Sequence, residues 1–517
     1  MNRYNQHDYL IKTTITWLFF SLCSLCVYAA PNKSDKSENS ATPVKSQFVN
    51  PALKSNTPFP DYQWFGEVDK ADKKTGQWVY REPGGHIKKI THYVANKLQG
   101  TTITFYDNGN KLVEFNYTNG VVDGPYKKYY KNGVLAQSKN YRMDVLVGVY
   151  KNYYPSGRLR VVKHYTNNII NGKYTSYYDN PKNTVNKTGE YKMGRKIGVW
   201  HKWTSYGANE FVENYVNNHR NGLNYYYIFG NLFRSENYVK GELNGKFTQY
   251  YLDKNKRIHI EGQYKKGINE GQWIYWRYSG GKKQKMVTYV NGYKQGLYNQ
   301  YDDQGRLWKK YYYVSNLISG PYIEYYSALN QKLRVKGQFT DGKRTGKWYY
   351  YLPNQTKPYQ IVNYKNDVKN GLTLLYYHSG RLWKSIEYKN DKRNGSYRGY
   401  FNNRSNTMAE KGQYENNEKH GQWELFYSTN GKLREKLEYV HDRLNGSYEK
   451  FFPSGNVWIR GEYKDGQLHG QYTEYFNSRR HLKRLSGAYD QGVETGNWYR
   501  WTTRQRRILI EHNTTAK

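Results

Sequence analysis

The sequence is poor in cysteine, proline and acidic residues. Its 517 residues include 2 cysteines, 13 prolines and 42 acidic residues, against 81 lysines and arginines. Both cysteines, Cys23 and Cys26, lie near the start of the chain, so the remainder has no disulfide, thiolate nucleophile or cysteine metal site. The shortage of acidic residues leaves a formal net charge of +39, which favours anionic partners.

The sequence also lacks the motifs that mark common enzymes. It has no His-Glu-x-x-His, no Gly-x-Ser-x-Gly, no phosphate-binding loop and no dinucleotide-binding fingerprint. No two of the thirteen histidines stand four residues apart, and they fall at varied positions, as solvated residues near turns do. The histidines are His7, His86, His92, His164, His201, His219, His259, His378, His420, His441, His469, His481 and His512. We therefore expect no catalytic residue, no metal and no cofactor, and a protein that is not an enzyme.

Long apolar runs are absent except for one near the start. Ile15 to Val27 is apolar, and Arg3 and Lys12 precede it, which is the pattern of a secretory signal peptide. The small residue Ala29 completes an acceptable cleavage site, so we predict a signal peptide over residues 1–29 with cleavage between Ala29 and Ala30. The mature protein would then be exported to the periplasm, the cell envelope or the medium.

Two alternatives to cleavage are weaker. The apolar run is shorter than the roughly 20 residues that a membrane-spanning helix needs, so we expect no transmembrane span in the mature chain. Lipidation at Cys26 is disfavoured because Leu25 stands where a small residue is required.

Composition divides the rest of the chain into three parts. Residues 30–60 are rich in Ser, Lys, Asn and Pro, which indicates a disordered linker. Residues 61–503 carry a repeat, and residues 504–517 form a basic tail with Arg504, Arg506 and Arg507. Mean hydropathy is −1.04, a value typical of unfolded chains, but 60 Tyr, 17 Phe and 14 Trp supply large rings that can be buried. We expect a folded array whose core is made of tyrosine.

The repeat begins with a glycine, has an aromatic residue two positions later and an aromatic pair near positions five and six. A turn, an apolar residue near position eleven and a tyrosine near position seventeen follow, as in the copy from Gly124 to Tyr141. The mean period is roughly 25 residues, the range of stacked supersecondary units. The leading glycines are Gly76, Gly100, Gly124, Gly148, Gly172, Gly198, Gly222, Gly245, Gly271, Gly296, Gly320, Gly346, Gly371, Gly395, Gly421, Gly446, Gly470 and Gly496.

Each repeat is interpreted as a β-hairpin. Pairs that tolerate the positive φ of tight turns recur about every twelve residues, which leaves no room for long helices. They include Asn108-Gly109, Asn132-Gly133, Ser156-Gly157, Ser379-Gly380, Asn430-Gly431 and Ser454-Gly455 at one end, and Asn119-Gly120, Lys240-Gly241, Asn291-Gly292 and Asp341-Gly342 at the other. Strand alternation predicts that positions 0, 2 and 6 share one face of the first strand, and positions 11 and 17 share one face of the second. The expected fold is all-β, an elongated solenoid-like array of about eighteen antiparallel hairpins of roughly 24–26 residues.

The glycine-aromatic-x-x-aromatic-aromatic pattern and the Asn-Gly turn, seen from Gly124 to Gly133, resemble the MORN repeat, and more closely its bacterial, antitoxin-like variant. The resemblance covers about Gly76 to Trp501. It implies a hairpin array that contacts proteins or membrane lipid and has no catalytic residues. Short aromatic hairpins of choline-binding cell-wall modules are a second resemblance, visible at Gly346 to Tyr351.

The function that the sequence favours is an exported scaffold that binds a macromolecular partner, a protein or an anionic envelope lipid or polysaccharide, through a cationic, tyrosine-rich face. Basic clusters and tryptophans outside the repeated positions are the candidate contacts. They are Lys127, Lys128, Lys282, Lys283, Trp308, Trp383, Trp458, Arg479 and Arg480. Two alternatives are an immunity or antitoxin-like inhibitor of a toxin and a cell-wall carbohydrate-binding module. Nucleic acid is an unlikely partner for an exported chain.

Overall fold

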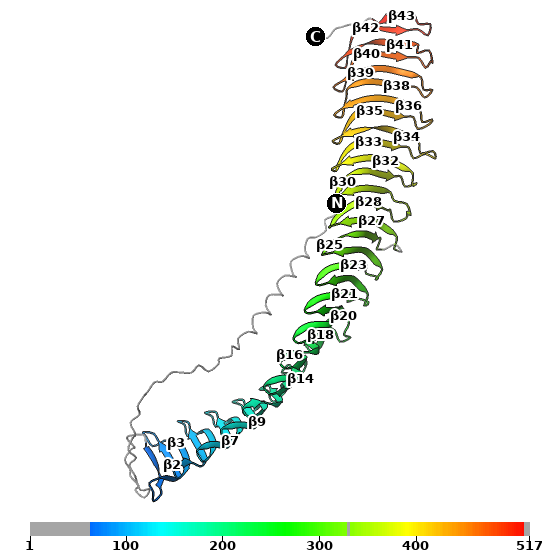
Figure 1. Cartoon of the computed structure of the whole chain (residues 1–517). Helices are drawn as coiled ribbons and strands as arrows, with labels where there is room; N and C mark the ends of the chain where they lie inside the picture. The colour runs from blue at the N-terminus through cyan, green and yellow to red at the C-terminus, as the bar shows by residue number, and fades with distance from the viewer. Residues whose placement is uncertain (1–62, 328–330, 511–517) are drawn as a thin grey trace.

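A computed structural model of the chain describes residues 63–327 and 331–510. The predicted signal peptide, its cleavage site at Ala29 and Ala30, and the predicted linker over 30–60 lie outside the described residues. The described residues form one sheet of 43 strands. Every pairing in it is antiparallel and joins strands that are consecutive or nearly so along the chain. Within the described ranges there is no helix, and no pairing joins the last strand to the first. The elongated all-β hairpin array is therefore confirmed, as an open sheet (Figure 1).

The strands follow one another in a continuous meander. In the first third they are β1 (Gln63–Val68), β2 (Lys74–Arg81), β3 (Ile87–Val94), β4 (Lys97–Leu98), β5 (Gly100–Phe105), β6 (Lys111–Thr118), β7 (Val121–Tyr129), β8 (Leu135–Arg142), β9 (Val145–Tyr153), β10 (Leu159–Thr166), β11 (Ile169–Ile170), β12 (Gly172–Tyr177), β13 (Val185–Lys192), β14 (Arg195–Trp203) and β15 (Asn209–Val216). In the second they are β16 (His219–Arg220), β17 (Gly222–Ile228), β18 (Asn231–Val239), β19 (Glu242–Tyr250), β20 (Ile258–Lys265), β21 (Ile268–Trp276), β22 (Lys283–Val290), β23 (Tyr293–Tyr301), β24 (Leu307–Val314), β25 (Leu317–Ile318), β26 (Gly320–Tyr325), β27 (Leu333–Thr340), β28 (Lys343–Tyr350) and β29 (Gln360–Lys365). In the last they are β30 (Val368–Lys369), β31 (Gly371–Tyr376), β32 (Leu382–Lys389), β33 (Lys392–Tyr400), β34 (Met408–Glu415), β35 (Glu418–Phe426), β36 (Leu433–Val440), β37 (Arg443–Leu444), β38 (Gly446–Phe451), β39 (Val457–Lys464), β40 (Gln467–Tyr475), β41 (Lys483–Asp490), β42 (Val493–Trp501) and β43 (Arg507–Ile510).

The two ends of each hairpin use different turns. At one edge of the ribbon the turn has two central residues with positive φ, as at Asn119 (52°) and Gly120 (88°), which is the geometry of a type I′ turn. At the other edge the turn is longer and in most copies has a single residue with positive φ, as at Gly133 (83°). All the turn pairs named from the sequence stand at these two edges, so those predictions are confirmed.

The tight turns without glycine use Asn or Asp as their second residue. Asn168 has a φ of 64°, and its Oδ1 accepts a hydrogen bond of 2.8 Å from the backbone N–H of Leu146 in the preceding hairpin. Asp144 accepts the same bond from Val122. A side chain that tolerates the left-handed conformation therefore also joins one hairpin to the one before it.

Each leading glycine lies in the left-handed region of φ, for example Gly124 at 106°. Around it the pairing slips, since Phe115 pairs with Tyr126 but Tyr117 pairs with Val122. This is a bulge, and it bends the strand where a side chain on the glycine would be strained. Six of these bends interrupt a strand and leave a two-residue piece ahead of the glycine, namely β4, β11, β16, β25, β30 and β37.

A second bulge near the longer turn corrects the predicted faces. Leu135 pairs with Tyr129, and Gln137 pairs with Lys128, so Ala136 is the extra residue. The bulge reverses the alternation, which puts position 11 on the opposite face from position 17, where the sequence analysis had placed both together. The aromatic pair at positions five and six is likewise divided between the two faces.

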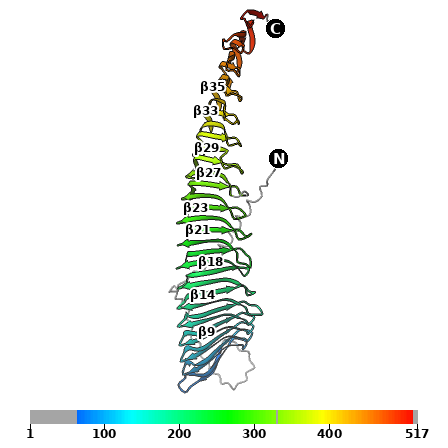
Figure 2. The same ribbon diagram turned by 90° about the vertical axis from the view of Figure 1, so that its right-hand side faces the viewer.

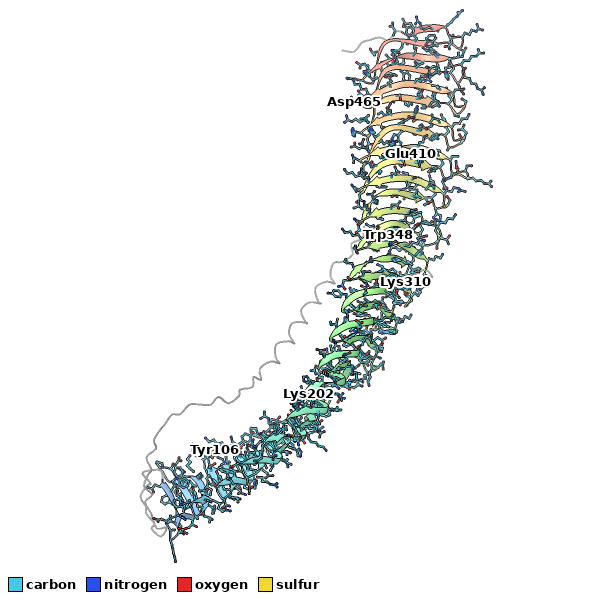
Figure 3. The ribbon with its side chains drawn as sticks, in the orientation of Figure 1. Tyr106, Lys202, Lys310, Trp348, Glu410 and Asp465 are labelled. Carbon is cyan, nitrogen blue, oxygen red and sulfur yellow. The ribbon has the colours of Figure 1, made fainter. Side chains whose placement is uncertain are left out.

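The sheet is a single twisted layer whose side chains project from both faces along its whole length (Figure 3). The C-terminal half is seen broadside in Figure 1 and the N-terminal half in Figure 2, because the twist of the sheet accumulates over many strands. Strand β43 lies within the segment predicted as a basic tail and pairs with β42, so the sheet continues to Ile510.

Candidate functional site

One face of the ribbon carries the most buried rings, and we call it the tyrosine face. In a 24-residue hairpin it holds positions 2, 4, 13, 15 and 17, and position 12, the extra residue of the second bulge, joins them. Around Tyr126, for example, the ring of Tyr141 packs edge-on with centroids 6.1 Å apart, and the Lys139 ammonium lies 4.3 Å from the Tyr126 centroid. Because no second layer of described residues covers the sheet, these rings and the lysine stems provide the apolar burial.

A row of basic residues crosses this face two positions before the leading glycines. Each cation lies above the rings of positions 2 or 17, such as Lys419, whose ammonium is 4.4 Å from the Trp423 centroid and 4.9 Å from that of Tyr439. Within the described ranges, only Arg220 and Arg344 of this row also form ion pairs with carboxylates. The row consists of Lys74, Lys196, Arg220, Lys294, Arg344, Lys369, Arg393 and Lys419.

A row of tyrosine hydroxyls closes the edge of the long turns. The tyrosine at position six donates to the backbone carbonyl of position five in the next hairpin, as Tyr130 does to Tyr153 at 2.6 Å. The same bond links two neighbours in the hollow described next, since Tyr326 donates to the Tyr351 carbonyl at 2.8 Å. The donors are Tyr106, Tyr130, Tyr154, Tyr178, Tyr251, Tyr326, Tyr377 and Tyr427.

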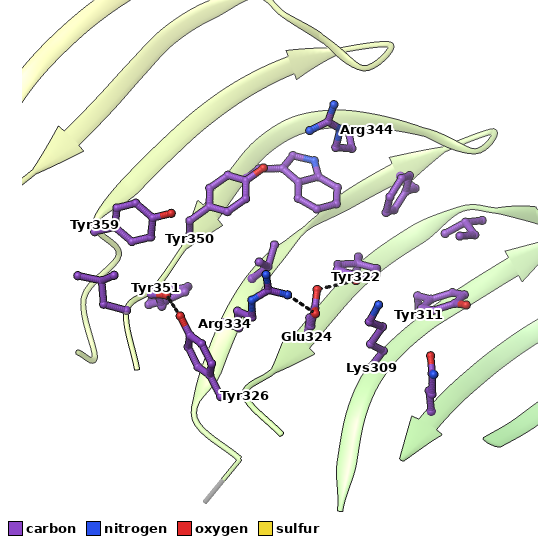
Figure 4. Close-up of a pocket in the computed structure, with 16 residues that line it drawn as sticks. Lys309, Tyr311, Tyr322, Glu324, Tyr326, Arg334, Arg344, Tyr350, Tyr351 and Tyr359 are labelled. Atoms are coloured by element: carbon purple, nitrogen blue, oxygen red, sulfur yellow. Dashed lines mark hydrogen bonds and ion pairs between the residues drawn. The ribbon is translucent and has the colours of Figure 1, made fainter. Parts of the chain in front are cut away.

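The tyrosine face is hollowed between β23 and β29, where a cavity of about 610 Å³ opens (Figure 4). Half of its lining residues are aromatic, and Lys309, Glu324, Arg334 and Arg344 add charges. Its labelled lining consists of Lys309, Tyr311, Tyr322, Glu324, Tyr326, Arg334, Arg344, Tyr350, Tyr351 and Tyr359. A second, smaller hollow of about 420 Å³ lies on the same face around Tyr154, Arg160 and Tyr174.

The charges in the larger hollow are unevenly matched. Glu324 is nearly buried, forms an ion pair with Arg334 and accepts a 2.9 Å hydrogen bond from Tyr322. Arg344 pairs with Asp367. Lys309 has no carboxylate partner among the described residues; its ammonium lies 4.4 Å from the Trp308 centroid. The hollow therefore offers an unneutralised cation beside aromatic walls.

Burial keeps the hydroxyls of the hollow protonated. Desolvation raises the pKa of Tyr311 well above its usual value, and its hydrogen bond with Tyr313 adds to the effect. Desolvation also raises the pKa of Tyr322, and the Glu324 carboxylate contributes further. The walls thus act as hydrogen-bond donors and apolar surface rather than as acids or bases at neutral pH.

The structure disperses the residues that the sequence analysis singled out. Four of them, Lys128, Trp308, Trp383 and Trp458, lie on the tyrosine face. Lys127 lies on the opposite face because adjacent strand residues alternate, and Lys283 is also there, 5.8 Å from the ring of Trp276. The others stand in the turns that precede β22 and β41, namely Lys282, Arg479 and Arg480.

The array also has a longer period, which the single-hairpin pattern did not predict. Every third hairpin from Trp200 on has tryptophan at position 2, and that ring covers a glycine of the preceding strand. From Trp273 onward the step is 75 residues. The glycine and tryptophan pairs are Gly189 and Trp200, Gly262 and Trp273, Gly337 and Trp348, Gly412 and Trp423, and Gly487 and Trp498, with Gly66 and Trp78 near the start. From Gly189 onward the signal was present as Gly-x-Tyr or Gly-x-Phe ahead of Gly-x-Trp.

Residues 63–327 and 331–510 contain neither a cluster of metal ligands nor a membrane-spanning helix. No group of three or more His, Cys, Asp or Glu is placed to hold a metal ion. No helix there is long and apolar enough to cross a membrane.

Comparison with known proteins gives no family. No protein-family model matches the chain, and no curated protein does. Solved structures that match include TcdB2-TccC3 without its hypervariable C-terminal region, at 10% identity and a TM-score of 0.15, over 87% of this chain and 26% of that chain. The Photorhabdus luminescens Tc holotoxin pore matches at 11% identity and a TM-score of 0.13, over 88% and 27%. This chain thus spans about a quarter of those chains' length, and the low scores carry no inference about it.

Proposed function

We propose that the protein is a non-enzymatic, exported scaffold that binds a macromolecular partner, a protein or an anionic envelope surface, through its tyrosine face. The observation that supports this most is the row of basic side chains above the rings of that face, most of them without a carboxylate partner among the described residues. The attraction of a cation to a ring, about 0.5–1 kcal/mol at an exposed site, favours the position in which the charge lies above the ring and is presented to a ligand.

The proposal also takes the chain to be a MORN-type repeat protein of the bacterial variant. In such an array each hairpin depends mainly on its neighbours, and binding over several hairpins is expected to decline gradually as hairpins are removed. The hollow between β23 and β29 is a place where a partner's side chain or headgroup could enter.

A retention assay tests the proposal. The purified chain from residue 30 would be applied to anionic vesicles, envelope polysaccharide and envelope proteins at low and high salt. Charge-driven binding should weaken as salt rises, because screening shortens the reach of surface charges to about 10 Å at 0.1 M.

A charge-matched pair of variants identifies the face. K294Q/K369Q/K419Q removes three cations of the basic row, and K127Q/K151Q/K310Q removes three from the opposite face, with the same change in net charge. The first variant should lose retention at lower salt than the second. Equal losses would show that net charge alone binds the partner, and the proposed face would be wrong. Cell fractionation tests export, which would be contradicted by a cytosolic, uncleaved chain.

A further inference from the structure

Three of the tryptophans on the tyrosine face are equivalent residues of the longer period. Trp308, Trp383 and Trp458 each stand twelve residues after a leading glycine, and each step between them is 75 residues. They lie on β24, β32 and β39. Six strand spacings separate neighbours, a distance along the ribbon of about 29 Å at 4.8 Å per strand.

Each of these indoles has an ammonium group above it. The distance from Nζ to the ring centroid is 4.4 Å for Lys309 and Trp308, 4.8 Å for Lys384 and Trp383, and 4.5 Å for Lys450 and Trp458. No ion pair between the described residues involves any of the three lysines. The three charges are therefore open to an external anion.

The third lysine comes from a different strand. Lys309 and Lys384 follow their tryptophans in sequence and pair across the hairpin with Gln300 and Leu375. Lys450 instead occupies the place of those partners, opposite Ile459. The pairing of ammonium with indole thus recurs although the lysine has moved to the other strand of the hairpin.

Cations also lie above rings of this face farther toward the N-terminus, although at other pairs of positions. Arg160 lies 5.5 Å from the Tyr154 centroid, and Arg234 lies 4.7 Å from that of Tyr226. Among the described residues that stand twelve positions after a leading glycine, only Trp308, Trp383 and Trp458 are tryptophans, whose ring is larger than that of tyrosine, and Trp383 is 40% exposed. We call Trp308 with Lys309, Trp383 with Lys384, and Trp458 with Lys450 the indole sites.

We propose that the indole sites bind one continuous anionic polysaccharide, whose acidic groups meet the ammonium groups and whose sugar rings lie against the indoles. This inference rests on the proposed function, and it identifies the macromolecular partner as an anionic polysaccharide. A regular spacing along a ribbon fits a linear polymer. Because the ribbon twists between the sites (Figures 1 and 2), they do not face one flat plane, so a flexible chain can follow them where a membrane surface cannot.

Linked sites make the affinity depend on polymer length. A chain that spans two sites, about 29 Å, gains from the high effective concentration at the second, and one that spans about 58 Å reaches all three. Avidity of this kind can exceed single-site affinity by 10²-fold or more.

The experiment uses size-fractionated polygalacturonate as the probe, with the purified chain from residue 30 and calorimetric or fluorescence titration. We expect fractions shorter than about 29 Å to bind weakly and fractions longer than about 58 Å to bind about 10²-fold more tightly. W308A/W383A/W458A should lose that gain, and each single variant should lose part of it. Equal affinity for short and long fractions, or an unchanged gain in the triple variant, would overturn the inference.

Controls separate this inference from general charge binding. K309Q/K384Q/K450Q should lose the gain, whereas K127Q/K151Q/K310Q, with the same change in charge on the opposite face, should keep it. Polyglutamate of equal length and charge should show a smaller gain, and equal gains with both polymers would refute a sugar contact. Unchanged circular dichroism and melting confirm that the variants fold. One further outcome is that the chain fails to bind polygalacturonate and still binds vesicles or an envelope protein, with that binding reduced in K294Q/K369Q/K419Q. In that case this inference fails and the proposed function stands.

Discussion

The indole ring of Trp423 on β35 lies directly against Gly412 on β34, where a side chain on residue 412 would overlap the ring. Trp423 is fully buried, its Nε1 donates to the Gln413 carbonyl at 3.1 Å, and the ring of Tyr397 lies 5.2 Å away. Glycine and tryptophan together therefore fill a space that neither would fill alone.

We expect Gly412→Ala to destabilise the array by about 1–3 kcal/mol through overpacking, and Trp423→Ala by about 3–5 kcal/mol. In the double variant the added methyl group meets no ring, so Gly412→Ala should change the free energy of unfolding little when Trp423 is already alanine. Denaturant unfolding of the four proteins in a double-mutant cycle would measure this coupling. Strictly additive effects would contradict a direct contact.

Gly461→Ala provides the matched control for that cycle. Residue 461 stands at the equivalent place before a hairpin with tyrosine, and a methyl group there would lie 3.2 Å from Cδ2 of Tyr472. The smaller ring leaves more room, so this substitution should destabilise less than Gly412→Ala.

Removal of three hairpins should be tolerated better than removal of one. Deletion of residues 346–420 brings Trp423 to the place of Trp348 above Gly337, and the period is kept. Deletion of 346–370 brings Thr373 there instead and leaves a void, which should cost about 3–5 kcal/mol more. Thermal and denaturant unfolding of both proteins test this, and a single-hairpin deletion that is as stable as the triple one would count against a three-hairpin unit.

Loss of one tyrosine hydroxyl at the long-turn edge should loosen two hairpins locally. Tyr130→Phe removes the hydrogen bond to the Tyr153 carbonyl and should destabilise by about 0.5–1.5 kcal/mol. Faster amide exchange confined to β7 through β10 would be the signature, because each hairpin depends on its neighbours. Uniform loss of protection along the whole array would argue against such local dependence.

Alkaline solution should unfold the array. Burial raises the pKa of Tyr275 to about 12, and burial together with the Glu114 carboxylate raises that of Tyr129 to about 12, from 10.0. An unfolded chain loses these protons near pH 10 and the folded one near pH 12, so stability is full below pH 10 and falls between pH 10 and 12. Tyrosinate absorbance and circular dichroism, followed together, check this.

The tyrosine variants test the cause of that alkaline loss. Tyr129→Phe should make the transition less steep, since it removes one titrating hydroxyl. A transition that lies entirely below pH 9 would contradict the assignment to buried tyrosines.

Local rules predicted the fold because the array is made of local contacts. Pairs such as Asn119-Gly120 and Asn132-Gly133 specify the turns, and the leading glycines adopt the positive φ that only glycine readily accepts. The predicted face of Leu135 was wrong because a bulge at Ala136 reverses the alternation of side chains. No residue type in the sequence predicts that bulge.

The candidate site was harder to predict because it depends on pairing between strands. Lys127 and Lys128 form one cluster in sequence and lie on two faces in the sheet. A comparison of single hairpins makes Trp308, Trp383 and Trp458 look irregular. They are equivalent only when the repeating unit is taken as three hairpins. At Trp458 the residue that follows the tryptophan is not a lysine, and Lys450 of the neighbouring strand supplies the ammonium group instead. This replacement depends on the pairing of the two strands, so neither strand alone predicts it.

Nearly every hydrogen-bonded pairing in this sheet joins a strand to its neighbours in the chain. Tension applied between the two ends would therefore act on all hairpins in series, and the least stable hairpin would open first while the rest stayed intact. Such a molecule would extend in small steps under strain and recover its length on release, because no distant contact has to be found again. A tether with that mechanical response could keep hold of a moving partner.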